Sequence, residues 1–300
     1  MNYLVCTPKR LSADKLVAAA KTAVSVNPLN HSPLERLSRL MPGFTSSPER
    51  IAVVTSKYWG IQGVSLTVKF MDNPPTDLRK RLLLHMNAWA KTANVKFVES
   101  DTDPKVRIAR AGGADGGYWS YVGTDILHIP KSKQTMNLEG FTMQMPESEF
   151  HRVVRHETGH TLGFPHEHMR RGLVAKLDVA KTIAYFERTQ GWSEDEVRAQ
   201  VLTPIEESTL RGTSVDARSI MCYQLPGEIT LNGKPIIGGT DIDAKDYGFA
   251  GLIYPKKNAS PSAPTKKTVA ATKKAAATTK AVTPKKTSAA KKNARILKRR

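Results

Sequence analysis

Cysteine is scarce in this chain, since only Cys6 and Cys222 occur among its 300 residues. Two cysteines permit at most one bridge, between each other, so a fold held together by a disulfide framework is excluded. Such low cysteine usage is typical of a reducing compartment, or of an exported protein that relies on its apolar core. Hydrophobic residues make up 40% of the chain, which is enough to build such a core.

Long apolar runs are also missing. No stretch approaches the roughly 18–20 residues that a membrane-spanning helix needs. The N-terminal string MNYLVCTPKRLSADKL lacks the apolar centre of a secretory signal. From these two absences we expect no transmembrane segment, and a protein that stays in the cytoplasm or is exported by another route.

Acidic residues are absent from the end of the chain. Residues 256–300 hold 15 of the 46 Lys and Arg residues and no Asp or Glu, so most of the net charge of +19 lies there. This Lys-, Ala-, Thr- and Pro-rich segment cannot bury enough apolar surface to order itself, which predicts a disordered basic tail. Its spaced lysines suit a polyanion, such as nucleic acid or an anionic surface, through counterion release. The alternative is a merely solubilising tail.

The rest of the chain divides into two parts. Residues 1–50 are poorly patterned and contain four prolines between positions 28 and 48, with one short helix predicted over Leu11–Val24 and Ser12 as its cap. We expect them to form an N-terminal arm or a pro-segment. Residues 51–255 have the alternating and helical periodicities of one globular domain.

Strands and a helix come first in this domain, and helices and loops follow, which is an α+β pattern. Short alternating apolar segments predict four strands, at Val64–Phe70, Val95–Phe97, Val106–Ile108 and Ile126–Ile129. Apolar residues at helical spacing predict helices at Asp77–Ala93, Ser148–Leu162, Leu177–Thr189, after a capping box that begins at Ser193, and at Asp243–Ile253.

One string carries the chemistry, namely HETGHTLGFPH from His156 to His166. Residues four apart share one face of a helix, so His156 and His160 can present two imidazoles to one metal ion. Gly163 can adopt a left-handed backbone conformation, which ends the helix and turns the chain back. His166 is then able to supply a third nitrogen. Glu157 lies beside these ligands without being one of them.

Three neutral ligands leave a position open for water, which is typical of a catalytic rather than a structural zinc site. One catalytic Zn²⁺ is therefore expected. Such an ion lowers the pKa of water to roughly 7, and Glu157 can take a proton from that water and pass it to a leaving amine. These demands match hydrolysis of peptide bonds. The alternatives are a histidine-rich surface helix or a structural site, for which His168 is the nearest fourth ligand.

The extended string HETGHTLGFPHE resembles the zinc-binding motif of the metzincin clan of peptidases, in the form found in the astacin family. Two further segments sharpen the likeness. Ser219–Tyr223 (SIMCY) is similar to the Met-turn S-x-M-H-Y, with Cys222 in place of histidine. Gly117–Gly123 (GYWSYVG) is similar to G-C-x-S-x-V-G, with Tyr118 where the family has a cysteine. The disulfides of animal astacins are therefore missing, which favours a bacterial-type relative.

The resemblance, which covers roughly residues 58–255, implies a metzincin-like fold. An N-terminal mixed sheet with helices lies above a cleft, the zinc helix forms its floor, and a small C-terminal subdomain carries the Met-turn. Met221 is implied as an apolar support beneath the metal, and Tyr223 as a partner of the oxyanion. An edge strand, here Ile126–Ile129, would bind substrate in extended form. Glu167 would pair with a new N-terminus after proteolytic maturation, and the family favours an extracellular location.

Two functions from different classes follow. The first is a zinc metalloendopeptidase acting on protein or peptide substrates, with residues 51–255 as its catalytic domain. The second is a nucleic-acid- or anionic-surface-binding protein with a non-catalytic metzincin scaffold. The intact Glu157 favours the first, because a scaffold needs no base. Cys6 could act as a zinc-blocking thiol in a pro-segment, although VCTP is no recognised switch motif.

Overall fold

The computed structural model describes residues 6–7, 9–30, 47, 52, 55–205 and 214–256. A five-stranded mixed sheet in the order β2-β1-β3-β5-β4 forms the first half of the domain. The strands are β1 (Val64–Phe70), β2 (Val95–Glu99), β3 (Val106–Ala109), β4 (Tyr118–Ser120) and β5 (Met136–Leu138). All neighbours are parallel except β4, which pairs antiparallel with β5 at the edge of the sheet.

The expected edge strand at Ile126–Ile129 is wrong. Residues Gly123–His128 form a 3₁₀ helix instead, and the edge strand next to the active-site helix is β4. Ile126 and Ile129 are three residues apart, which matches the period of a 3₁₀ turn rather than the alternation of a strand. Strands β4 and β5 have three residues each, too few to display that alternation in sequence.

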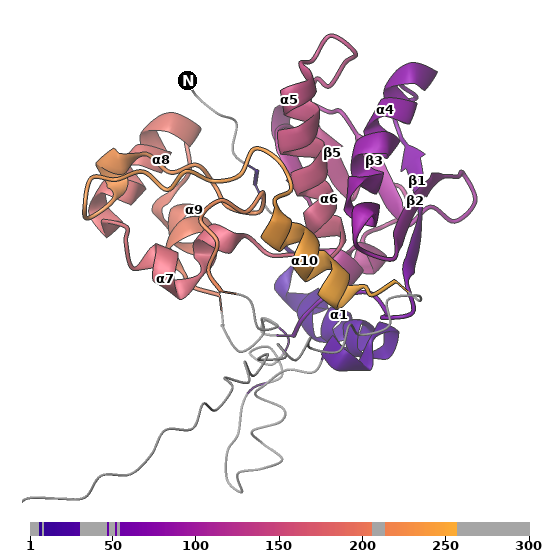
Figure 1. The fold of residues 1–300 in the computed structure, drawn as a ribbon, viewed down its shortest axis with the longest axis horizontal. Coiled ribbons are helices and arrows are strands. Elements are labelled where there is room, and N and C mark those ends of the chain that lie inside the picture. Colours follow the sequence, from indigo (N-terminus) through magenta and orange to yellow (C-terminus); the bar gives the residue numbers. More distant parts are fainter. Residues whose placement is uncertain are drawn as a thin grey trace, which may run out of the picture. The chain divides into compact units, whose positions relative to one another are not determined.

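Helices complete the domain, and all except the short α7 were predicted from sequence, with shifted ends. They are α1 (Ala13–Val26), α4 (Thr76–Met86), α5 (Glu147–Glu149), α6 (Arg155–Thr161), α7 (Arg171–Val174), α8 (Val179–Gln190), α9 (Glu194–Val197) and α10 (Ala244–Ile253). A π-helical stretch, Phe150–Val154, joins α5 to α6. In Figure 1 the sheet, α4 and α5–α6 lie on one side, α7–α9 on the other, and α10 between them. None of the helices described is long and apolar enough to cross a bilayer.

The apolar core explains this division. A larger cluster joins the inner faces of the sheet to α4 and the active-site helix, around the fully buried Trp89, Phe141 and Phe150. A smaller cluster lies among α7–α9 and the segment after the Met-turn, around Phe186 and Val201. Met221 belongs to the larger cluster, whereas Cys222 and Tyr223 belong to the smaller one, so the predicted Met-turn, Ser219–Tyr223, lies where the two cores meet.

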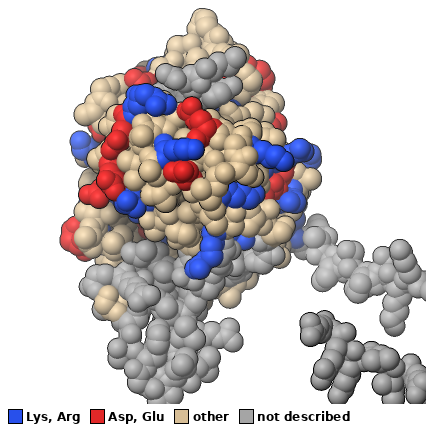
Figure 2. Space-filling view, turned by 90° about the vertical axis from the view of Figure 1, so that its left-hand side faces the viewer, with Lys and Arg blue, Asp and Glu red and all other residues tan. Residues whose placement is uncertain are grey.

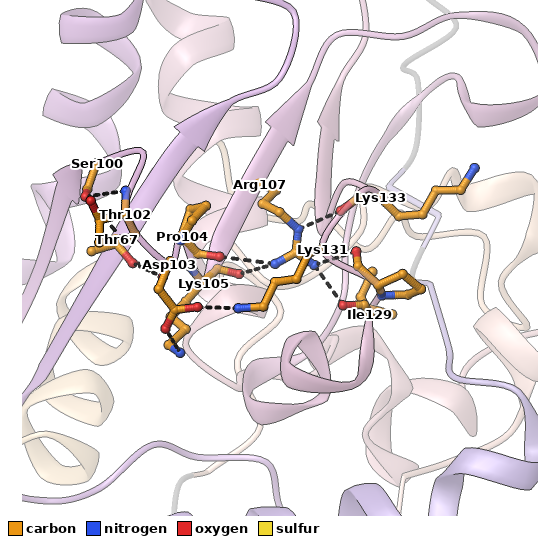
Figure 3. Close-up of polar contacts among 11 residues, drawn as sticks. Thr67, Ser100, Thr102, Asp103, Pro104, Lys105, Arg107, Ile129, Lys131 and Lys133 are labelled. Atoms are coloured by element: carbon orange, nitrogen blue, oxygen red, sulfur yellow. Dashed lines mark hydrogen bonds and ion pairs between the residues drawn. The ribbon is translucent and has the colours of Figure 1, made fainter.

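Arg107 on β3 ties two loops to the sheet (Figure 3). Its guanidinium donates to five backbone carbonyls, those of Pro104, Lys105, Ile129, Pro130 and Lys133, at 2.7–3.3 Å. The residue is 3% exposed. Beside it, the carboxylate of Asp103 pairs with the ammonium groups of Lys105 and Lys131. One buried side chain thus holds the loop before β3, at residues 104–105, and the loop before β5, at residues 129–133.

Part of the predicted N-terminal arm folds onto the domain. Helix α1 confirms the expected helix, and Ser12 stands at its N-cap position without a side-chain capping bond. The Thr22 hydroxyl lies 2.9 Å from His128 Nε2. Asn27 and Asn30 donate to the carbonyls of residues 59 and 58 at 2.6 and 2.7 Å. The predicted disordered tail, from residue 257 onward, lies outside the described residues.

Candidate metal centre

Three imidazoles converge at the end of the active-site helix. His156 and His160 lie one turn apart on α6, and His166 follows the glycine break. The Nε2 atom of His166 is 3.1 Å from that of His156 and 3.0 Å from that of His160. All three residues are buried. The structure thus brings together the three predicted ligands.

The glycine break is built as the sequence requires. Gly163 has φ +95°, a left-handed conformation that side-chain-bearing residues rarely adopt. Its N–H donates to the carbonyl of His160, and the N–H of Phe164 donates to that of Gly159, which closes the helix. The Trp59 indole donates to the carbonyl of Thr161 at 2.9 Å. The end of the helix is therefore fixed, and His166 is held at a constant distance from the other two imidazoles.

The site fits a zinc ion. Tetrahedral zinc with Zn–N bonds near 2.0–2.1 Å has its ligand atoms about 3.3 Å apart, close to the Nε2 spacing observed here. Nδ1 of His156 bonds the carbonyl of Ile220 at 2.6 Å, and Nδ1 of His160 bonds that of Phe164 at 2.8 Å. Because a carbonyl oxygen only accepts, these two rings donate through Nδ1, and the lone pair on Nε2 is left for a metal. Burial lowers the pKa of His156 to about 4, and of His160 and His166 well below the usual value, so all three rings are neutral near pH 7.

Glu157 is fully buried beside the three imidazoles. Its Oε2 accepts a hydrogen bond from the Cys6 thiol at 3.5 Å. Its Oε1 has no hydrogen-bond partner within the described part of the chain. Burial raises the pKa of Glu157 to about 8. An unpaired carboxylate oxygen at this depth is costly, and such groups persist at sites where a water or a substrate atom completes the pairing.

The predicted Met-turn, Ser219–Tyr223, packs against helix α6. A methyl group placed on Gly159 would lie 2.4 Å from the sulfur of Met221, so a larger residue here would require the Met221 side chain to shift. The turn itself is fixed by Asp246, which accepts hydrogen bonds from the Ser219 hydroxyl at 2.6 Å and the Ile220 N–H at 2.9 Å. Because Ile220 also accepts from His156, Asp246 supports a predicted ligand through one intervening residue. Asp246 is not among the residues predicted for the site, and its only sequence signal is the capping box that it forms with Asp243.

Tyr223 lies beside the imidazoles. Its ring stacks on His168 with centroids 3.8 Å apart and meets His166 edge-on at 4.4 Å. Its hydroxyl donates to the carbonyl of Cys6. His168 itself turns away, with Nε2 on the carbonyl of Gln200 at 2.9 Å. Tyr223 is therefore near the metal centre, and His168 is not grouped with the three predicted ligands.

Glu167 is paired inside the domain. Its Oε1 accepts from the N–H of Asp216 at 2.8 Å and lies 3.6 Å from the guanidinium of Arg170. Burial raises the pKa of Glu167 to about 7. The predicted pairing of Glu167 with a processed N-terminus stays a prediction.

Cys6 also reaches the centre. The thiol sulfur and the three Nε2 atoms all lie within 4.8 Å of one another. Cys6 and Cys222 are both free thiols, so the bridge that the sequence permits is not formed. The N–H of Thr7 donates to the carbonyl of Tyr118 on β4 at 3.0 Å. A small cavity of about 50 Å³ remains, lined by Cys6, Tyr118, Arg152, Glu157 and Tyr223 among others, which has room for water.

A second group of possible metal-binding side chains consists of His85, Glu147 and His151. Glu147 Oε1 lies 3.1 Å from His85 Nε2 and 3.4 Å from His151 Nε2. Arg81 already pairs with Glu147, and Arg155 donates to Nδ1 of His85 at 3.3 Å. An arginine bond at Nδ1 leaves the proton of a neutral ring on Nε2, and this buried atom has no hydrogen-bond partner among the described residues.

A family model described as Astacin, a peptidase family, matches residues 54–227. The zinc metalloproteinase nas-27 of Caenorhabditis elegans is 30% identical over 127 residues, which are 41% of this chain and 26% of that protein. The chain thus spans about a quarter of this relative. A structure of myroilysin is 30% identical with a TM-score of 0.63, over 68% of this chain and 98% of that one. A second myroilysin structure is 28% identical with a TM-score of 0.51, over 67% and 87% of the two chains.

Proposed function

This chain belongs to the astacin family of peptidases, and on that premise we propose that it is a zinc-dependent endopeptidase in which Glu157 is the general base. One observation carries the proposal. The unpaired, buried Oε1 of Glu157 lies next to three neutral imidazoles, with Nε2 of His166 3.1 and 3.0 Å from those of His156 and His160. A carboxyl group with one unpaired oxygen beside a set of three ligands suits the activation of water.

The chain's own residues supply the remaining steps. His156, His160 and His166 would hold a zinc ion, which when bound would supply Lewis acidity for the ionisation of water and the polarisation of the scissile carbonyl. Glu157 takes the proton of the attacking water and passes it to the leaving amine. The Tyr223 hydroxyl, which donates to a peptide carbonyl in this structure, would donate in the same way to the oxyanion of the substrate.

The substrate is a peptide in extended form. Strand β4 has β5 on one side only, so its other edge offers backbone groups to an added strand. The Ser120 hydroxyl at the end of β4 lies 3.1 Å from that of Thr161 on the zinc helix. This contact couples the edge strand to the helix that carries the base. A peptide paired with β4 would therefore pass over the three imidazoles.

The alternative function, a binding protein with a non-catalytic metzincin scaffold, has less support. Figure 2 shows Lys and Arg interspersed with Asp and Glu on the face it displays, without a continuous basic patch. Residues 1–255 hold 31 basic and 27 acidic residues, which is close to balance. Binding of polyanions through the folded domain therefore has no evident basis on this face.

The first test is metal dependence. We expect the purified Cys6→Ala chain, in which the thiol no longer occupies the centre, to contain about one zinc per chain and to cleave casein. Dialysis against a chelator should abolish cleavage, and added zinc should restore it. A chain that holds one zinc yet leaves casein and a mixed peptide library intact would contradict the proposal.

For the tail we propose polyanion binding by charge alone, because residues 256–300 hold 15 basic residues and no acidic one. Retention on heparin or DNA should fall steeply with salt, since each neutralised phosphate releases a counterion. A chain that ends at residue 256 should lose this retention and keep its peptidase activity. Equal retention of the two chains would contradict the tail's role, and loss of activity would contradict the domain boundary at 255.

A further inference from the structure

Two histidines and one glutamate meet where helix α4 packs against the helical run α5–α6 (Figure 1). We propose that His85, Glu147 and His151 bind a second divalent ion, of the zinc and nickel class, in addition to the ion expected at the active site. This site lies outside the proposed peptidase function, and its test needs no substrate. Three observations support it, namely the spacing of the ligand atoms, an unpaired buried nitrogen, and the hydrogen bonds that surround the group.

The three ligand atoms have the spacing of a zinc site. Glu147 and His151 are four residues apart on one helical run, and His85 reaches the same point from the last turn of α4. Glu147 Oε1 lies 3.1 Å from His85 Nε2 and 3.4 Å from His151 Nε2. Ligand atoms on a tetrahedral ion with bonds of 2.0–2.1 Å are about 3.3 Å apart. One ion therefore fits between these atoms without a large movement of the helices.

The nitrogen that faces this group from α4 is buried and unpaired. His85 is 2% exposed, and its Nε2 has no hydrogen-bond partner within the part of the chain that the structure describes. It approaches Oε1 of Glu147 to 3.1 Å without forming a hydrogen bond. Two atoms that ligate one ion point at the ion rather than at each other, and at this separation their bonds leave the line between them by about 40°. The arrangement therefore suits an ion better than a direct bond.

The surrounding hydrogen bonds leave the ligand atoms available. Asp241 Oδ2 lies 3.0 Å from Nδ1 of His151, which places the ring proton there and leaves the lone pair of Nε2 for a metal. Arg81 donates twice to Oε2 of Glu147, at 2.5 and 3.2 Å, so that Oε1 faces the two histidines. Arg155 pairs with Asp241 at 2.5 Å. The charges of these two arginines and two carboxylates cancel, so a dication meets no net repulsion from them.

One contact opposes ligation. Arg155 Nε donates to Nδ1 of His85 at 3.3 Å, whereas a ring that ligates through Nε2 carries its proton on Nδ1. This hydrogen bond is long, and Arg155 keeps its shorter bond to Asp241 when the long one is lost. Metal binding therefore moves the ring proton of His85 from Nε2 to Nδ1 by exchange with water, with no net release of a proton, and turns Arg155 Nε away from the ring.

An ion at this site would join α4 to the start of the active-site helix. The side chains of Glu147 and His151 are 56% and 31% exposed, so the ion can enter from solvent and water can complete its coordination. Two imidazoles and one carboxylate suit zinc, nickel or copper, whereas magnesium and calcium prefer sites made of oxygen ligands. The expected consequence is a domain that zinc stabilises beyond the effect of the active-site ion.

The test measures bound zinc in the full-length chain by equilibrium dialysis. We expect wild type to bind one ion more than His151→Ala, about two ions against one. The matched control is His128→Ala, which removes another half-buried histidine, bonded to Thr22, and should bind as wild type does. Asp241→Asn replaces the anion on Nδ1 of His151 with a neutral acceptor, so it should weaken the second ion by about 10–100-fold.

Thermal unfolding gives a second readout, starting from chains whose active site is already loaded. Zinc at a hundredfold excess over its Kd should raise Tm by about 5–10 °C in wild type and in His128→Ala. The same addition should leave His151→Ala unchanged, and magnesium or calcium should leave wild type unchanged. If His151→Ala does not fold, Glu147→Gln takes its place, because it changes an exposed side chain and removes the charged ligand oxygen.

Equal zinc binding by wild type, His151→Ala and Glu147→Gln would overturn the inference, since any second ion would then lie elsewhere. A rise in Tm that survives in both variants, or that calcium produces equally well, would overturn it too. The outcome is separable from that of the proposed function. Wild type that binds one ion, and His151→Ala that binds none, would support this site and count against the active-site zinc.

Discussion

Replacing Glu157 with glutamine should lower kcat/KM for peptide cleavage by about 10²–10⁴ while the zinc stays bound. Glutamine fills the same volume in this fully buried site but has no charge and cannot take a proton from water. The three ligand nitrogens belong to other residues, so the metal content should remain at one ion per chain. The measurement compares steady-state cleavage and bound zinc in Cys6→Ala and Cys6→Ala/Glu157→Gln, since both lack the blocking thiol.

The control is Glu187→Gln, which removes an exposed carboxylate on α8 and should leave the rate unchanged. The pH profile adds a second criterion. A base works only when ionised, so cleavage should rise with pH as Glu157 loses its proton, and this rise should be absent from the glutamine variant. A glutamine variant that kept more than about a tenth of the activity would exclude Glu157 as the base, because the effect would fall below that of general-base catalysis.

The three imidazoles could be predicted from sequence because their geometry is local. A four-residue spacing on a helix and one left-handed glycine fix His156, His160 and His166 within eleven residues. Most strands and helices were also predictable, since β1 and α8 carry the alternating or helical periodicity of half-buried elements. The mixed sheet, the α+β class and membership of the astacin family agree with those expectations.

The contacts that Cys6 and Asp246 make at the site do not follow from local sequence patterns, although Cys6 was considered as a candidate thiol. Cys6 lies 151 residues from Glu157 along the chain, and Asp246 lies 27 residues from Ser219. No periodicity in the sequence predicts either of these contacts. The edge strand β4 is only three residues long, and its pairing with β5 depends on the sheet as a whole. Contacts that arise from tertiary packing override weak local signals, which is why the prediction of an edge strand at Ile126–Ile129 is wrong.

The largest loss of stability without a change at the active site is expected for Arg107→Met. The methionine donates no hydrogen bond, so the five carbonyls lose the guanidinium, although that of Pro130 keeps a bond from the Lys133 N–H. Each buried carbonyl left unpaired costs about 1–3 kcal/mol, and some will find water, so we expect the free energy of unfolding to fall by about 3–5 kcal/mol. Guanidinium chloride unfolding followed by tryptophan fluorescence measures this change.

Arg107→Lys should recover only part of the loss, because an ammonium has three donors and lacks the planar fork that reaches carbonyls on two loops at once. Arg188→Met removes a 66%-exposed side chain, paired at 3.5 Å with Glu228, and should change stability by less than about 0.5 kcal/mol. The slope of the unfolding curve should stay constant if only stability changes. A loss below about 1 kcal/mol for Arg107→Met would mean that the loops hold without the guanidinium, since even one orphaned carbonyl costs that much. Because Arg107 is remote from the three imidazoles in sequence and makes no contact with them among its hydrogen bonds, the folded variant should retain its zinc and its cleavage rate.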